Sequence, residues 1–190
     1  MRDAMIFEGG FSDVSRDSAR AFRSAMNAMA HPGRKFDLTG AKPPAPLSEA
    51  AAGLLLVLAD ANTPVFLTGE HDTDLIRGWI TFHTGTALAT TPDQASFALG
   101  TWDALLPLRQ WPAGSAEYPD RSATLIIEHP GEGETARLSG PGIQTHQDCA
   151  LPAITPFRDN AAQFPLGLDF YFCQGSTVRA LPRSTKVEAI

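Results

Sequence analysis

The C-terminal segment holds the side chains best suited to bind a phosphate-rich ligand. It gathers cations and hydroxyl groups in a chain of 190 residues whose formal net charge is −6. Guanidinium and ammonium groups pair with phosphate oxygens, and hydroxyl groups add hydrogen bonds. The segment therefore predicts an anion-binding site or a contact with another protein of a complex, although a solvated basic tail fits the same pattern. The residues concerned are Arg179, Arg183, Ser184, Thr185 and Lys186.

A second group of small polar residues could also approach phosphate. In the sequence His83-Thr84-Gly85-Thr86, the glycine would let backbone and hydroxyl donors come close to an anion. A helix that ends at Gly85 explains the same glycine without a ligand, and this structural interpretation is the favoured one. His83 and Thr84 are therefore secondary candidates. The turn Ser139-Gly140-Pro141-Gly142 is also interpreted as structural, because its proline lacks an N–H donor.

Motifs of common catalytic machinery are missing from the sequence. It contains neither the GxSxG turn of hydrolases nor the GxxxxGK[ST] loop of P-loop nucleotide enzymes. A pyridoxal-phosphate enzyme needs a lysine in an enclosed pocket, whereas Lys35, Lys42 and Lys186 lie beside a helix end, in a proline-rich loop and in a polar tail. We assign no catalytic residue and expect no cofactor. Whether the chain alone is an enzyme stays open.

A metal centre is not expected either. The two cysteines, Cys149 and Cys173, stand apart and form no CxxC motif. His146, Asp148 and Cys149 lie close in sequence and could meet a metal, but polar loop residues are more often solvated or hydrogen-bonded. The cysteines are interpreted as ordinary buried thiols of a reducing compartment.

Composition favours a single cytoplasmic domain over residues 1–190. An apolar fraction of 43% is enough for one substantial core. The acidic charge argues against a nucleic-acid surface, which needs clustered lysine and arginine. The most apolar run, residues 50–59, is about half the length of a membrane helix, and the N-terminus lacks the pattern of a signal peptide.

Helical spacing of apolar residues predicts three main helices. The first covers residues 15–30 and stops at His31-Pro32-Gly33. The second begins after an N-cap at Ser48, ends near Asp60 and is apolar on several faces. The third follows Asp72 or Thr73, runs through Phe82 and ends at a Gly85 cap.

Strand-like runs alternate with these helices. They cover residues 65–67, 96–99, 123–128, 136–139, 168–173 and 177–181, with a short helix over 102–108. A turn through Pro130 and Gly133 joins the third run to the fourth, and Gln174-Gly175 joins the last two as a hairpin. Early alternation followed by hairpins predicts an α/β fold with a mixed sheet covered by helices.

Several stretches together resemble one family. They are FRSAMNAMAHPGR, LLLVLADANTPVFL, ITFHTGTAL, ARLSGPGI, FPLGLDFYFC and ALPRSTKVE, which span residues 22–188 in order. They are similar to the PhnH family, whose members are components of the carbon-phosphorus lyase complex. That resemblance implies a complex with subunits G, I and J that forms ribose 1-phosphonate 5-triphosphate from ATP and an organic phosphonate. It also implies a three-layer α/β/α fold similar to pyridoxal-phosphate-dependent transferases, without the cofactor and without agreed catalytic residues.

Two functions of different classes follow from these expectations. The first is an assembly subunit that is a homodimer when isolated and docks through the apolar strand 168–172 and its hairpin. The second is a subunit that itself binds ATP or a phosphonate, through Arg179 and Arg183, and presents it to its neighbours. A stand-alone transferase is a third, weaker alternative.

Overall fold

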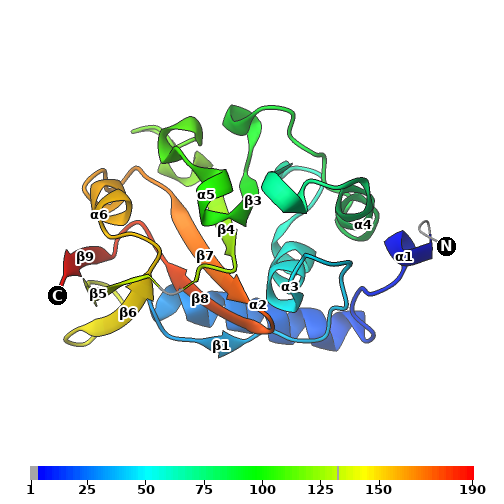
Figure 1. Ribbon diagram of the computed structural model, residues 1–190, viewed down its shortest axis with the longest axis horizontal. Coiled ribbons are helices and arrows are strands. Elements are labelled where there is room, and N and C mark those ends of the chain that lie inside the picture. The colour runs from blue at the N-terminus through cyan, green and yellow to red at the C-terminus, as the bar shows by residue number, and fades with distance from the viewer. Residues whose placement is uncertain (1–3, 132) are drawn as a thin grey trace.

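A mixed sheet of six strands forms the centre of the protein in the computed structural model, which describes residues 4–131 and 133–190 (Figure 1). Its order is β1-β8-β7-β4-β3-β2. The last four strands of that order are parallel to one another, whereas β8 pairs antiparallel with both β7 and β1. The predicted α/β class with a mixed sheet is confirmed. The strands are β1 (Phe36–Asp37), β2 (Val65–Leu67), β3 (Phe97–Thr101), β4 (Thr124–Glu128), β7 (Asp169–Gln174) and β8 (Thr177–Leu181).

Helices cover both faces of this sheet. The helices α2 (Val14–Ala30), α3 (Glu49–Leu58) and α4 (Asp74–Thr84) pack on one face, and α1 (Ala4–Phe7) packs on α4. The short helices α5 (Trp102–Leu105) and α6 (Thr155–Ala161) pack on the other face. Strand β7 contributes to both cores, since Tyr171 faces α2 and α3 whereas Phe170 and Phe172 face α6. Within the described residues, four 3₁₀ turns lie in the connections between these elements: Gly69–His71, Pro92–Gln94, Leu108–Gln110 and Pro119–Arg121.

Local capping residues set the helix ends, as the sequence predicts. The Ser48 hydroxyl accepts the N–H of Ala51 at 3.2 Å, and Thr73 accepts that of Ile76 at 3.2 Å. Gly85 adopts the left-handed conformation, with φ of 70°. Helix α3 is buried on several faces. Within the part of the chain that the structure describes, no helix has the length and apolarity needed to cross a membrane.

The predicted hairpin at Gln174-Gly175 is confirmed, but its place in the sheet corrects the predicted docking surface. Strand β7 has β4 on one side and β8 on the other, so it lies inside the sheet and offers no free edge. Residues Leu168, Phe170 and Phe172 are all buried. A strand whose backbone groups are already paired cannot accept another chain. The expectation that 168–172 forms an exposed interface is therefore wrong.

A second, three-stranded antiparallel sheet contains one predicted strand, 136–139, and two strands that the sequence analysis did not predict. It pairs β6 (Gln147–Leu151), β5 (Glu134–Ser139) and β9 (Lys186–Ala189) in the order β6-β5-β9. The predicted runs 123–128 and 136–139 are thus in different sheets, because β3 and β7 already occupy both edges of β4. Lys186, expected in a polar tail, begins strand β9, in which Val187 is buried.

Gly142 lies between β5 and β6, and its backbone closely approaches the end of α2. We therefore expect Gly142→Ala to be strongly destabilising. A Cβ atom at Gly142 would lie 2.0 Å from the carbonyl oxygen of Ala30, and φ there is +81°. Gly85 also has a positive φ, but a Cβ atom there meets nothing within 4 Å. We expect Gly85→Ala to lower the free energy of unfolding by about 1 kcal/mol and Gly142→Ala by more than about 2 kcal/mol. Urea unfolding measures both, and equal losses would contradict the close contact.

Candidate functional site

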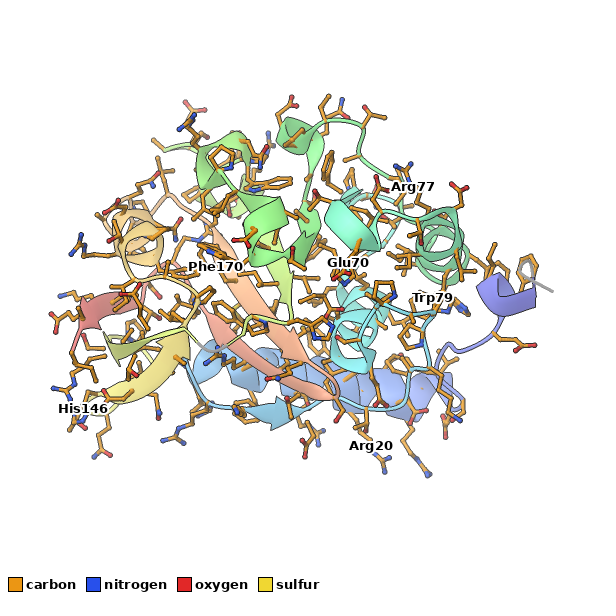
Figure 2. All side chains as sticks on the ribbon, in the orientation of Figure 1. Arg20, Glu70, Arg77, Trp79, His146 and Phe170 are labelled. Carbon is orange, nitrogen blue, oxygen red and sulfur yellow. The ribbon has the colours of Figure 1, made fainter. Side chains whose placement is uncertain are left out.

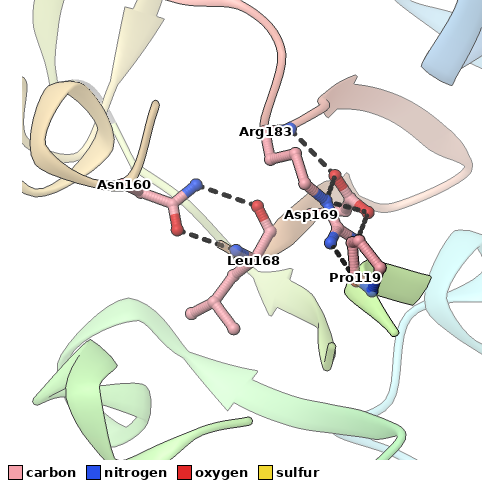
Figure 3. A network of polar contacts seen from close by, with 5 residues as sticks. All are labelled: Pro119, Asn160, Leu168, Asp169 and Arg183. Atoms are coloured by element: carbon pink, nitrogen blue, oxygen red, sulfur yellow. Dashed lines mark hydrogen bonds and ion pairs between the residues drawn. The ribbon is translucent and has the colours of Figure 1, made fainter. Parts of the chain in front are cut away.

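Arg183, a predicted ligand residue, is held in an ion pair inside the protein (Figure 3). Its backbone N–H donates to Asp169 Oδ1 at 2.8 Å, and its guanidinium donates to both carboxylate oxygens of Asp169. A further N–H donates to the carbonyl oxygen of Pro119 at 2.6 Å. The two side chains are 14% and 21% exposed. These contacts use the donors that a phosphate would need, so Arg183 is a structural residue here.

Asn160 on α6 extends the same network (Figure 3). Its side-chain amide donates to the carbonyl oxygen of Leu168 at 2.9 Å, and its side-chain oxygen accepts the N–H of Leu168 at 2.8 Å. Leu168 comes directly before Asp169. The segments FPLGLD and PRSTKVE therefore meet in space, and they meet to fix β7, the end of β8 and α6 relative to one another.

The remaining C-terminal candidates do not converge on a site with Arg183. Ser184 is half-buried, and Lys186 is exposed on strand β9. Thr185 is buried, and its hydroxyl has no hydrogen-bond partner within 4–131 and 133–190. The contiguous basic segment of the sequence is thus divided in space between an ion pair, a buried turn and the small sheet.

The second candidate group, at the end of α4, is structural. The Thr84 hydroxyl donates to the carbonyl oxygen of Ile80 at 2.7 Å and accepts the N–H of Thr86 at 3.1 Å. The imidazole of His83 hydrogen-bonds through Nε2 to the carbonyl oxygen of Glu8 at 3.2 Å and packs against Trp79. Both side chains therefore have local partners, as the favoured interpretation expected.

Arg179 differs from these residues because it lies in a cleft. Its guanidinium carbon is 5.0 Å from the ring centroid of Phe172, its cross-strand partner on β7. Among the described residues, its side chain makes no hydrogen bond or ion pair. Burial lowers the pKa of Arg179 from its ordinary value, because removal from water disfavours the charged form. A partly buried cation that has no carboxylate partner in the described part of the chain is suited to receive an anion.

The cleft around Arg179 lies where the main sheet approaches the small sheet and has a volume of about 440 Å³. Lys35 supplies a second cation to this cleft. From the sequence alone, this residue is considered only as a possible pyridoxal-phosphate lysine. No carboxylate is found among the lining residues that the structure describes. The other residues of the lining are Pro130, Gly131, Gly133, Ala150, Phe172, Gln174, Thr177 and Val178.

The residues weighed as metal ligands do not form a metal centre. Among the described residues, no three or more histidine, cysteine, aspartate or glutamate side chains form a cluster that could hold a metal ion. Asp148 is paired with Arg137 at 3.1 Å, and His146 lies at the periphery (Figure 2). Burial raises the pKa of Cys149 and of Cys173, which leaves both as poor nucleophiles and poor ligands.

A buried pair of titratable groups, Glu128 and His71, escaped the sequence analysis. Both side chains are fully buried, with Glu128 Oε1 3.8 Å from His71 Nε2. Glu128 Oε1 accepts the backbone N–H of Ser48 at 2.7 Å, which ties the end of β4 to the start of α3. Burial raises the pKa of Glu128 and lowers that of His71, so both groups favour their neutral forms. The residues lie far apart in sequence, and no local pattern indicates their contact.

Comparisons with known proteins agree on one family. The family model described as "Bacterial phosphonate metabolism protein (PhnH)" matches residues 9–188. The alpha-D-ribose 1-methylphosphonate 5-triphosphate synthase subunit PhnH of Rhizobium meliloti is 38% identical over 97% of each chain. The putative C-P lyase subunit protein HtxG of Stutzerimonas stutzeri is 32% identical, covering 88% of this chain and 84% of its own length.

Removing the Arg183 side chain should destabilise the fold through the ion pair that it forms. We expect Arg183→Ala to lower the free energy of unfolding by about 2–4 kcal/mol, because it leaves a largely buried Asp169 carboxylate unpaired. Arg77 makes the same two-pronged contact with Asp72 at the surface, where the side chains are 49% and 31% exposed. The matched change Arg77→Ala should cost much less, because water screens an exposed ion pair. Similar losses in denaturant titrations would contradict the structural role of Arg183.

The buried carboxyl of Glu128 should make stability depend on pH in a defined direction. Since its pKa is raised in the folded state, its contribution to stability is complete below the ordinary glutamate pKa and is lost as pH rises through the folded pKa. Glu128→Gln keeps an acceptor for the Ser48 N–H but cannot ionise. We therefore expect the variant to gain stability relative to the wild type as pH rises over the range above the ordinary glutamate pKa of about 4.3. Unfolding titrations across that range measure the difference, and a pH-independent difference would contradict the raised pKa.

Proposed function

The chain belongs to the PhnH family of bacterial phosphonate metabolism proteins, and on that premise we propose that it is an assembly subunit of the carbon-phosphorus lyase complex. In this role it supports the synthesis of ribose 1-phosphonate 5-triphosphate from ATP and an organic phosphonate. The relative from Rhizobium meliloti is named as a subunit of the corresponding synthase. The partners we propose are subunits G, I and J, with a homodimer formed by the isolated chain in the cytoplasm.

Exposed apolar side chains on the helices at one side of the main sheet carry this proposal. Phe22 and Met26 lie one turn apart on α2 and are 46% and 55% exposed. Phe7 and Phe82 are 57% and 54% exposed and pack edge to face where α1 meets α4. Large apolar and aromatic residues that stay in water on a folded domain are typical of protein interfaces. They replace strand β7 as the expected docking region.

The supporting role also agrees with the chemistry of the described residues. The cleft of Arg179 can bind charge, but no nucleophile with a neighbouring general base accompanies it in the described part of the chain. Catalytic groups would then come from the other proteins of the complex. The predicted likeness to pyridoxal-phosphate-dependent transferases goes beyond the α/β class and stays a prediction.

A second candidate function is a ligand-binding subunit that presents ATP or a phosphonate to its neighbours. The cleft of Arg179 and Lys35 favours it, since two cations converge there with no carboxylate among the described lining residues. Arg183, which the sequence grouped with Arg179, no longer supports it because of the pair with Asp169.

Co-expression tests the assembly role. The tagged chain is produced together with subunits G, I and J of the same organism, captured by its tag and examined by native mass spectrometry. We expect co-purification in a fixed ratio, and a dimeric mass for the chain produced alone. Recovery of the chain by itself, under conditions in which the other proteins assemble, would contradict the proposal.

Paired variants locate the docking region in the same experiment. Phe22→Glu with Met26→Glu should abolish co-purification without unfolding the domain, because both side chains are exposed. Phe164→Glu is the matched control, since Phe164 is 60% exposed beyond α6, on the opposite face of the sheet. If the double variant still co-purifies like the control, the docking region is not on α2.

A further inference from the structure

The position of Arg179 on β8 determines what its guanidinium can reach. Its neighbours Val178 and Ala180 are buried in the core on the α2 side, whereas Arg179 points toward Phe172 on the opposite face. That face is the one next to the small sheet, whose residue Ala150 lines the same cleft. The guanidinium is thus held between two sheets by the ring of Phe172 and by strand pairing. A cation held in this way is preorganised for a ligand.

The opposite wall of the cleft is formed by the chain that leaves β4. Pro130 and Gly131 follow the end of this strand, and a Cβ atom at Gly131 would meet nothing within 4 Å. Gly133 lies so close to the backbone of Leu151 that a Cβ atom would be 1.8 Å from its carbonyl oxygen. Gly133 therefore packs against the small sheet, whereas Gly131 leaves open space beside the cleft.

We propose that this cleft binds a small ligand through one tetrahedral, doubly charged oxyanion group of the phosphate and phosphonate class. The inference rests on the second candidate function and names its site and ligand. The planar fork of Arg179 donates two parallel N–H bonds to two oxygens of the anion. Lys35 is exposed and adds a second positive charge, but its flexible side chain does not fix the direction of its hydrogen bonds.

Size and charge distinguish this class from the alternatives. A volume of about 440 Å³ is within the range of small-molecule sites. Two cations neutralise one dianion, whereas a triphosphate carries more negative charge than the described lining can balance. A carboxylate leaves one cation unneutralised. The best match is therefore a single phosphate or phosphonate group with a small substituent.

Calorimetry on the isolated chain tests the proposal with four probes: inorganic phosphate, methylphosphonate, acetate and ATP. We expect inorganic phosphate and methylphosphonate to bind, with affinity that falls as salt rises. Acetate should bind at least roughly tenfold more weakly than either. Acetate binding equal to that of methylphosphonate, or no binding of either tetrahedral anion, would overturn the proposal.

Substitutions place the binding in the cleft. Arg179→Gln should reduce affinity for methylphosphonate by roughly tenfold or more, and Arg179→Lys should recover only part of it because an ammonium group lacks the fork. Lys35→Gln should reduce affinity by roughly threefold or more. The matched controls are Lys42→Gln and Arg20→Gln, two exposed cations elsewhere (Figure 2 shows Arg20 pointing outward from α2), and they should leave affinity unchanged. Equal effects at control and cleft positions would overturn the assignment.

Two further measurements keep the proposal testable if Arg179 variants fail to fold. Amide resonances of Gly131 and Gln174 in the wild-type chain should shift on titration with methylphosphonate, whereas those of Gly85 should not. Glu132 lies outside the described residues, and Glu132→Gln removes a negative charge next to Gly131 in the sequence, so it should leave binding intact or strengthen it. Binding that disappears in Glu132→Gln would overturn the proposed ligand charge.

The outcomes also separate this site from the proposed functions. ATP binding that Arg179→Gln leaves unchanged would overturn this site but keep the second candidate function. Absence of binding by every probe would overturn both. Neither result bears on the assembly role, which co-purification tests independently.

Discussion

The ion pair between Arg183 and Asp169 is the constraint on which the arrangement of the two sheets depends. Asp169 begins β7, and Arg183 follows the end of β8, so the pair closes the open end of the hairpin opposite its turn. The chain is held there as it leaves the main sheet, and it then enters the small sheet as β9. Since β9 pairs with β5, the ion pair also determines where the small sheet lies over the face formed by Phe170 and Phe172.

The two arginines near the end of β8 show how partners decide the role of a side chain. Arg183 has a carboxylate on β7 and a backbone carbonyl at Pro119, and these satisfy its planar array of donors. Arg179 faces the ring of Phe172, which attracts a cation but accepts no conventional hydrogen bond from it. From the sequence alone, both residues are candidates to bind an anion. Among the residues that the structure describes, Arg183 has partners for its donors, whereas Arg179 keeps its donors available to a ligand.

Features set by neighbouring residues could be predicted, and features set by distant residues could not. Ser48, Thr73 and Gly85 cap their helices because the capped groups lie within three or four residues. The strand-like run 168–173 predicted β7, but a strand pattern in the sequence does not tell a central strand from an edge strand. The pairing of β5 with β9, the pair of Arg183 with Asp169 and the contact of Glu128 with His71 all join segments that are separated in sequence. The basic C-terminal segment misled for the same reason, because its counter-charge lies on another strand.

The end of β4 lies between two polar parts of the protein, the buried Glu128 carboxyl and the Arg179 cleft. Glu128 turns inward, where it receives the Ser48 N–H at the start of α3, while the next residues lead out to Gly131 and the Arg179 cleft. An ionised carboxyl there would add negative charge to the edge of the sheet at which the cleft opens. Because burial raises the pKa of Glu128, its neutral form is favoured and this charge is diminished. The contact that anchors α3 to the sheet lies on the face opposite Phe172 and Arg179.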